Sequence, residues 1–381
     1  MDEIVLRFPH LVEQVLQKLG NKGLLKSREI ARSWQEFIDM KKYPWLRIVN
    51  IPTILRTVYI YHTMNCNTYS YLAAKHGQID MLKVILNSEM DLVKVDGFIS
   101  LHVACHYGRV KIIEMLLKKS DELKIDLSRK SRFGCTAFHL ACISGKSELA
   151  ELIMKNCCKL KIDLNEKDEY SKTGFVYACE HGRLEIVEML MNNCESMMID
   201  LNTLDKNNFN AFHFACQSAR SDIAKILMEE STKFKLDPNA KVKCGNTAFH
   251  FACESGSTSI VNMMLDESVF DLSLKADHFT TGFHFACIQG RTNIVKILID
   301  KSEFHKLDLA AKNSSGCTGF HFACRFGYTS IVEMLLNASE SLNLDLTAKT
   351  DWGSTGYQMA VFGKELDVID VIKRKMPSLI V

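Results

Sequence analysis

The sequence predicts an all-α protein, a solenoid of about nine stacked helix-pair repeats preceded by a small helical domain. Three observations support this fold class. A short segment recurs along most of the chain at a spacing of 37 residues, and an apolar pattern of helical period follows each copy. The first 48 residues carry two further helical patterns that lie outside the repeat.

The composition is that of a folded, soluble chain, with 47% hydrophobic and 24% charged residues over 381 positions. Its 47 basic and 45 acidic residues leave a net charge of +2 and form no basic block longer than Lys373-Arg374-Lys375. A nucleic-acid footprint needs a basic face, so we expect no nucleic-acid partner.

The first twelve residues mix acids and Arg7 with apolar residues, unlike a secretory signal. No stretch approaches the roughly 20 apolar residues that span a bilayer, so we expect no membrane contact and a cytoplasmic or nuclear location. The 14 cysteines would then lie in a reducing compartment, which disfavours a disulfide framework.

The recurring segment is clearest in Thr136-Ala-Phe-His-Leu-Ala-Cys142 and its copies. The shared alanine is spaced by 37 residues throughout, except for one spacing of 34 residues between Ala252 and Ala286. The alanines are Ala104, Ala141, Ala178, Ala215, Ala252, Ala286, Ala323 and Ala360. A degenerate copy, Tyr71-Leu-Ala-Ala74, precedes them, and the copy at Ala360 is also degenerate.

Each repeat predicts two short helices. The first begins at the Thr and ends near a glycine such as Gly256, where a left-handed cap needs no Cβ. A Ser or Thr two residues later, such as Thr258, is expected to cap the second helix, whose apolar stripe buries one face. One repeat cannot bury enough surface alone, so the repeats must stack.

These residues resemble the ankyrin repeat over about Asn65 to Lys373. Two departures stand out: the family's proline becomes Ala or Gly and its leucine becomes Phe, and the period is four residues longer. We expect the added residues, such as Lys118 to Ile125, to lengthen a loop. The resemblance implies a protein-binding scaffold with a concave face lined by the first helices.

A His three residues before a Cys in most copies could indicate a metal site or a Cys-His catalytic pair. Stacked helices lie roughly 8–10 Å apart, too far for one zinc ion at about 2.0–2.3 Å or for disulfides. The resemblance implies instead that the histidines tie adjacent turns and that the cysteines fill space. A cysteine-dependent enzyme stays open only as a minor alternative, and we expect no catalytic residues, metal or cofactor.

The copies differ most just after the shared alanine and at the turns before each first helix. These positions predict partner contacts because exposed aromatic and arginine side chains often dominate binding. An alternative is that unconstrained surface positions drift. The residues selected are Tyr107, His181, Arg325 and Phe326 on the first helices and Phe133, Tyr170 and Trp352 at the turns, where His278 holds the matching position.

Residues 1–48 contain Phe8-Pro9, two apolar helical patterns and Trp34. They resemble the F-box, which implies docking to the Skp-type adaptor of a cullin-RING ubiquitin ligase. The contacts implied are Pro9, Leu16, Leu19 and Leu24. The alternative is a helical cap on the first repeat.

The predicted domains are an F-box-like segment at 1–48, a helical connector at 49–65 and repeats over 66–381. The predicted function is substrate recognition for an SCF-type ubiquitin ligase, with an unidentified protein substrate held on the concave face and the chain monomeric outside the complex. The competing prediction is an ankyrin scaffold or inhibitor without a ubiquitin role.

Overall fold

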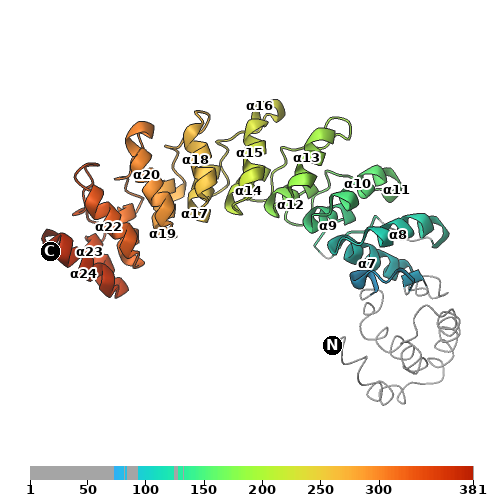
Figure 1. The fold of residues 1–381 in the computed structure, drawn as a ribbon, viewed down its shortest axis with the longest axis horizontal. Helices are drawn as coiled ribbons and strands as arrows, with labels where there is room; N and C mark the ends of the chain where they lie inside the picture. The colour runs from blue at the N-terminus through green and yellow to red at the C-terminus, as the bar shows by residue number, and fades with distance from the viewer. Residues whose placement is uncertain (1–72, 81, 84–92, 124–127, 132, 381) are drawn as a thin grey trace, which may run out of the picture. The chain divides into compact units, whose positions relative to one another are not determined.

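The computed structural model describes residues 73–80, 82–83, 93–123, 128–131 and 133–380. Over these residues it contains helices and turns and no strand, which confirms the all-α prediction (Figure 1). The chain divides into two compact units, an N-terminal unit (Met1–Asp168) and a C-terminal unit (Glu169–Val381). Among the described residues, no helix has the length and apolar character needed to cross a membrane.

The described part of the N-terminal unit contains helical residues at 73–76, 79–80 and 82–83, followed by two helix pairs. The first pair is α7 (Val93–His106) and α8 (Val110–Leu123), and the second is α9 (Ala137–Ser144) and α10 (Ser147–Lys155), followed by the short α11 (Cys157–Leu160). Helix α7 packs against both α8 and α9, so consecutive repeats contact through their first helices.

The C-terminal unit continues the same arrangement, with each first helix packed on the next first helix (Figure 1). We call the first helix of each repeat the inner helix and the second the outer helix. The inner helices are α12 (Gly174–Glu180), α14 (Ala211–Gln217), α17 (Ala248–Ser255), α19 (Gly282–Ile288), α21 (Gly319–Arg325) and α23 (Gly356–Gly363). The outer helices are α13 (Leu184–Asn193), α15 (Ser221–Glu229), α18 (Thr258–Asp266), α20 (Thr292–His305), α22 (Thr329–Ala338) and α24 (Leu366–Lys375). The remaining short elements are α16 (Ser231–Phe234), η2 (Asp277–Phe279) and η3 (Pro377–Leu379).

The helix ends follow the repeated residues closely. Thr318, with φ −100° and ψ 171°, is the N-cap of α21, and its side chain and that of His321 satisfy backbone N–H groups reciprocally. The predicted glycine stops are confirmed, since Gly145 and Gly256 end α9 and α17 in the left-handed region. The expected second cap is wrong. Thr258 is the first residue of α18, and Ser257 caps that helix by accepting from the Ile260 N–H. The N-cap residues of α10, α20 and α22 make no side-chain cap hydrogen bond.

The longer period has a different structural basis from the one expected. The added residues do not lengthen a loop. They form an extra helical turn after the outer helix, seen as α11, α16 and the last turn of α20. In several repeats this turn closes on a non-glycine residue with positive φ, including Lys161, Met198, Lys235, Lys306 and Asn343. Helix α18, at the 34-residue spacing, ends at Asp266 without this turn.

The unusual Phe and Gly positions fit one another across the stack. A Cβ added at Gly319 would overlap the ring of Phe283 in the preceding repeat and lie 2.9 Å from Cys287 Sγ. A Cβ added at Gly356 would likewise overlap the ring of Phe320 in the preceding repeat. In these repeats the Phe ring occupies the space that a side chain at the inner-helix start would need, and glycine there accommodates it.

Candidate partner-binding surface

The repeated histidines make the same hydrogen bonds in successive repeats and support the fold. In the C-terminal unit the Thr281 and Thr318 backbone N–H groups donate to Nδ1 of His284 and His321, at 3.2 and 3.1 Å. Because Nδ1 accepts, Nε2 carries the proton. Nε2 of His284 then donates to the Cys317 carbonyl at 3.1 Å, in the turn before the next inner helix. This confirms the prediction that the histidines tie adjacent turns.

Burial keeps these rings neutral. It lowers the pKa of His213 and of His250 to about 4, because the charged imidazolium is poorly solvated inside the stack. A ring that stays neutral and is bonded at both nitrogens, as His213 is to Asn210 and Ala240, has no proton to exchange near neutral pH. The histidines therefore hold the scaffold together.

The cysteine ladder is buried between the helices. Cys142, Cys216, Cys253 and Cys287 have no exposed surface, and burial raises the pKa of each thiol far above its usual range. A thiol that cannot ionise is a poor nucleophile and a poor metal ligand. Over the described residues, no group of three or more His, Cys, Asp or Glu side chains is arranged to hold a metal ion.

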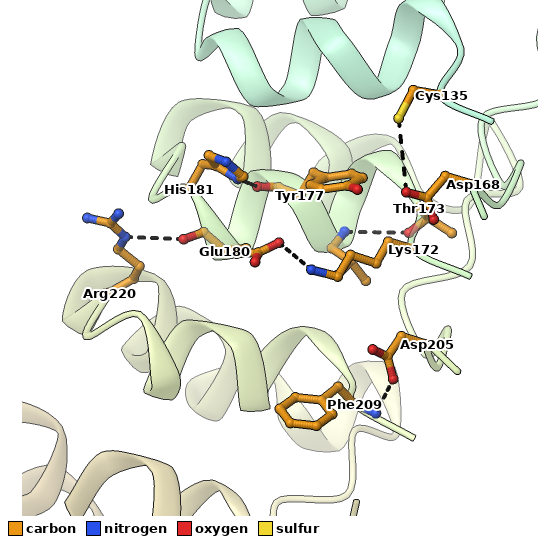
Figure 2. Close-up of polar contacts among 11 residues, drawn as sticks. Cys135, Asp168, Lys172, Thr173, Tyr177, Glu180, His181, Asp205, Phe209 and Arg220 are labelled. Atoms are coloured by element: carbon orange, nitrogen blue, oxygen red, sulfur yellow. Dashed lines mark hydrogen bonds and ion pairs between the residues drawn. The ribbon is translucent and has the colours of Figure 1, made fainter. Parts of the chain in front are cut away.

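The surface of α12 carries a compact polar cluster (Figure 2). Lys172 Nζ lies 2.8 Å from Glu180 Oε2, 4.1 Å from the centre of the Phe214 ring and 5.3 Å from that of Tyr177. His181 Nδ1 donates to the Tyr177 carbonyl at 3.1 Å. The ion pair and the two aromatic rings hold the Lys172 side chain along the helix. The positive charge of Lys172 and the negative charge of Glu180 therefore keep fixed positions on a half-buried surface.

An arginine from the following repeat closes each of several inner helices. Arg220 Nε donates to the Glu180 carbonyl at 3.3 Å, and Arg291 Nε donates to the Glu254 carbonyl at 2.8 Å. The glycine at the helix end makes room for it, since a Cβ at Gly182 would lie 2.8 Å from Arg220 Cδ. A cation at the last carbonyls also complements the helix dipole. These arginines were not selected from the sequence, although Arg291 follows Gly290 directly and Arg220 follows Ala219 at the matching position.

The predicted inner-helix contacts are accessible to different degrees. Arg325 and Phe326 are exposed at the end of α21, and the Phe326 ring lies 6.3 Å from that of Tyr328. Tyr107 and His181 are less accessible, because each is half-buried. Lys75 Nζ lies 5.6 Å from the centre of the Tyr107 ring. Arg325 and Phe326 are therefore the more available of the four.

The predicted turn residues are all exposed: Phe133 at 52%, Tyr170 at 53% and Trp352 at 72%. Successive turns of the C-terminal unit are joined by backbone bonds. The Lys243 N–H donates to the Asn207 carbonyl at 2.9 Å, and the Asp351 N–H donates to the Ser315 carbonyl at 3.0 Å. The turns thus form a connected row that presents its side chains at a regular spacing.

The selected residues are spread over both units and over several repeats. Tyr107 and Phe133 belong to the N-terminal unit, whereas Tyr170 and His181 lie several repeats before Arg325, Phe326 and Trp352 in the C-terminal unit. Lys172 and Phe279 were not selected from the sequence. Phe279 lies in a turn and is 62% exposed. The adaptor contacts Pro9, Leu16, Leu19 and Leu24, and the connector at 49–65, lie outside the described residues.

Comparison with known proteins identifies the repeat. A family model described as ankyrin repeats in three copies matches residues 57–130, 122–203, 154–241, 192–276, 232–308 and 268–350. No curated protein matches the chain. The matches leave residues 1–56 uncovered, and no F-box model matches there. Because they cover more than half of the sequence and agree with the stacked helix pairs, the chain belongs to the ankyrin repeat family.

Proposed function

We propose that the chain is a protein-binding solenoid whose inner-helix ends and turns hold a protein partner. Ankyrin repeat proteins are typically interaction scaffolds without enzymatic activity. The observation that carries the proposal is the contrast between scaffold and surface: the repeated His and Cys are buried, while Arg325, Phe326 and Trp352 are exposed. Exposed aromatic and arginine side chains on a rigid stack are suited to act as binding hot spots.

Quantitative affinity capture with the full chain tests this. The variant combines Arg325→Glu, Phe326→Ser and Trp352→Ser, and the matched control combines Glu188→Ser and Lys296→Ser, which are exposed on α13 and α20. We expect the first variant to lose at least one captured protein that the native chain and the control both retain. Identical capture by all three would count against this surface.

We further propose that the chain is a substrate receptor for an SCF-type ubiquitin ligase, with residues 1–48 docking a Skp-type adaptor. Support comes from the F-box-like pattern of Pro9, Leu16, Leu19 and Leu24. In this arrangement the chain supplies proximity, raising the local concentration of a bound substrate near the ligase.

Pull-down of the full chain with a Skp-type adaptor tests the ubiquitin role. We expect the native chain to bind and a Leu16→Asp, Leu19→Asp variant to lose binding, while the Phe326 and Trp352 variants bind normally. No binding by the native chain would leave the alternative, an ankyrin scaffold or inhibitor with a helical cap at its N-terminus.

A further inference from the structure

One repeat of the C-terminal unit departs from its neighbours in its turn. This is the repeat at the 34-residue spacing, in which α18 ends without the extra helical turn. The following turn, Asp277 to Thr280, contains two consecutive residues in the left-handed region: His278 with φ 59° and Phe279 with φ 58°. At the position of Phe279, other turns of this unit hold Gly245, Gly316 and Gly353 or the small polar residues Ser171 and Asn208, all with positive φ.

The conformation and exposure of Phe279 are energetically unfavourable. A bulky residue in the left-handed region is strained, and 62% of this residue is exposed to water. Within the described structure its ring makes no aromatic contact. Because most of Phe279 is exposed, its burial contributes little to folding, and its ring is available to a partner.

A cavity of about 240 Å³ lies in the same repeat and the next. Its apolar walls include Phe249, Phe283, Leu298 and Leu309, and Lys275 and Lys306 also line it. Small-molecule sites usually measure roughly 300–1,000 Å³, so this volume suits a single large side chain better than a cofactor.

The hydrogen-bond ladder is also incomplete beside this turn. His250 Nε2 is buried and has no hydrogen-bond partner among the described residues. The Thr280 and Leu274 carbonyls lie near enough to raise the pKa of the ring, but neither meets hydrogen-bond geometry. In the neighbouring repeats, the corresponding nitrogens of His213 and His284 do bond to carbonyls at 2.9 and 3.1 Å. The short repeat thus forgoes a stabilising contact that they keep.

We propose that this repeat is the anchor point for the protein partner, which presents an acidic, extended segment with one large apolar side chain. The apolar side chain fills the cavity, and the same segment contacts the exposed ring of Phe279, which lies two residues before Thr281 in the cavity lining. Carboxylates flanking it meet Lys275 and Lys306, both exposed, and Lys312 of the next turn. The inference rests on the proposed protein-binding function and adds the chemistry of the partner.

The charges of the residues that line the cavity favour an acidic partner segment. Asp308 is the one acidic side chain lining the cavity, against two lysines. Exposed Asp271 nearby is turned toward its own loop, accepting from the Ser273 N–H at 3.0 Å and from its hydroxyl at 2.6 Å. Nucleic acid is disfavoured because the walls are mainly aliphatic, whereas single strands need stacking platforms along a basic groove.

Fluorescence anisotropy of the full chain with labelled synthetic heptapeptides tests the proposal. The probe has a central Phe flanked by three Asp or Glu on each side. One control replaces the Phe by Ser, a second replaces the acids by Lys, and a third probe is a ten-nucleotide single-stranded RNA. We expect the acidic Phe peptide to bind at least about tenfold more tightly than the other three. Equal binding of the peptides, tighter binding of the RNA, or no binding at about 1 mM would overturn it.

Two glycine variants separate binding from folding. Phe279→Gly relieves the left-handed strain, so we expect it to raise the thermal midpoint by about 2 °C and to weaken the acidic peptide at least about fivefold. Met198→Gly is the matched control, since Met198 is 81% exposed with φ 52° in another repeat. It should leave peptide binding unchanged. Unchanged binding by Phe279→Gly would contradict the proposal.

A charge-reversed variant, Lys275→Glu with Lys306→Glu, completes the design. We expect it to prefer the lysine-flanked peptide, and a retained preference for the acidic peptide would contradict the proposal. The peptide experiments and the affinity capture test different claims. If no peptide binds but the Arg325, Phe326 and Trp352 variant still loses a captured protein, the anchor proposal fails and the proposed function stands.

Discussion

Arg291 Nε donates a 2.8 Å hydrogen bond to the backbone carbonyl of Glu254, so one repeat caps the inner helix of the repeat before it. The contact joins a guanidinium to the carboxyl-terminal end of α17, where the helix dipole favours positive charge. It is a direct link between repeats that does not depend on the buried core. The corresponding Tyr328 hydroxyl donates to the Ile288 carbonyl at 3.2 Å.

Removing this link should destabilise the stack modestly. We expect Arg291→Ala to lower the free energy of unfolding by about 1 kcal/mol, a small value because Arg291 is exposed to solvent. Urea unfolding followed by circular dichroism measures it. Arg325→Ala, exposed at the end of α21, is the control and should change the free energy by less than about 0.5 kcal/mol. Equal effects would show that the carbonyl contact contributes nothing.

The match between Phe283 and Gly319 predicts a non-additive pair. Gly319→Ala places a Cβ against the Phe283 ring, so we expect a loss of about 1–3 kcal/mol. Phe283→Leu should reduce that loss, because the smaller side chain leaves room for the new methyl group. Urea unfolding of the two single variants and the double variant gives the coupling free energy. A coupling near zero would mean that the two positions do not compensate each other.

Buried histidines predict acid sensitivity. The folded-state pKa of His213 and His250 is about 4, below the unfolded value of about 6.5, so the unfolded chain binds more protons between these values. Their contribution is fully present above pH 6.5 and is lost as pH falls toward 4, on the order of 3 kcal/mol for each ring.

Unfolding free energies measured from pH 7 to pH 4 test this dependence. His213→Gln is the matched variant, since Gln358 accepts the equivalent Thr355 N–H bond at 3.0 Å in the last repeat. It should flatten the pH dependence without removing the helix cap. The same slope in native and variant chains would contradict the assignment of a lowered pKa to His213.

Thiol accessibility should separate two classes of cysteine. Cys158 and Cys244 are exposed, whereas the ladder cysteines such as Cys216 and Cys253 are buried. We expect iodoacetamide to modify the first class quickly in the native chain and the second class only after denaturation. Peptide mass spectrometry resolves each site. Rapid labelling of Cys216 in the native chain would show that the stack opens or that the ladder is reactive.

Much of the scaffold could be predicted because repetition exposes its constraints. The Thr and His of most copies, such as Thr318 and His321, form the helix cap, and Gly256 ends its helix as expected. Burial of Ile186 was expected from the apolar period, and burial of Cys142 from the resemblance to the ankyrin repeat. These contacts are local or recur in each repeat, so a single sequence contains the information.

Other features depend on neighbouring repeats and were missed. The added residues can extend either a loop or a helix with the same composition, and only packing in the stack selects the extra turn seen in α16. Phe279 was overlooked because the neighbouring His278 matched the aromatic position, while the left-handed φ of Phe279 has no sequence signal without glycine. Lys172 was not selected because its ring partner Phe214 lies in the next repeat.

Site-specific photo-cross-linking tests the central claim of a protein-binding surface most directly. A photoreactive phenylalanine analogue replaces Phe279, Phe326 or Trp352 in the full chain, with Glu188 and Lys296 on the outer helices as controls. If the turns and inner-helix ends hold the partner, the first three positions yield a shared cross-linked protein and the two controls do not. Cross-links confined to the outer-helix positions, or equal at all five, would contradict binding at this surface.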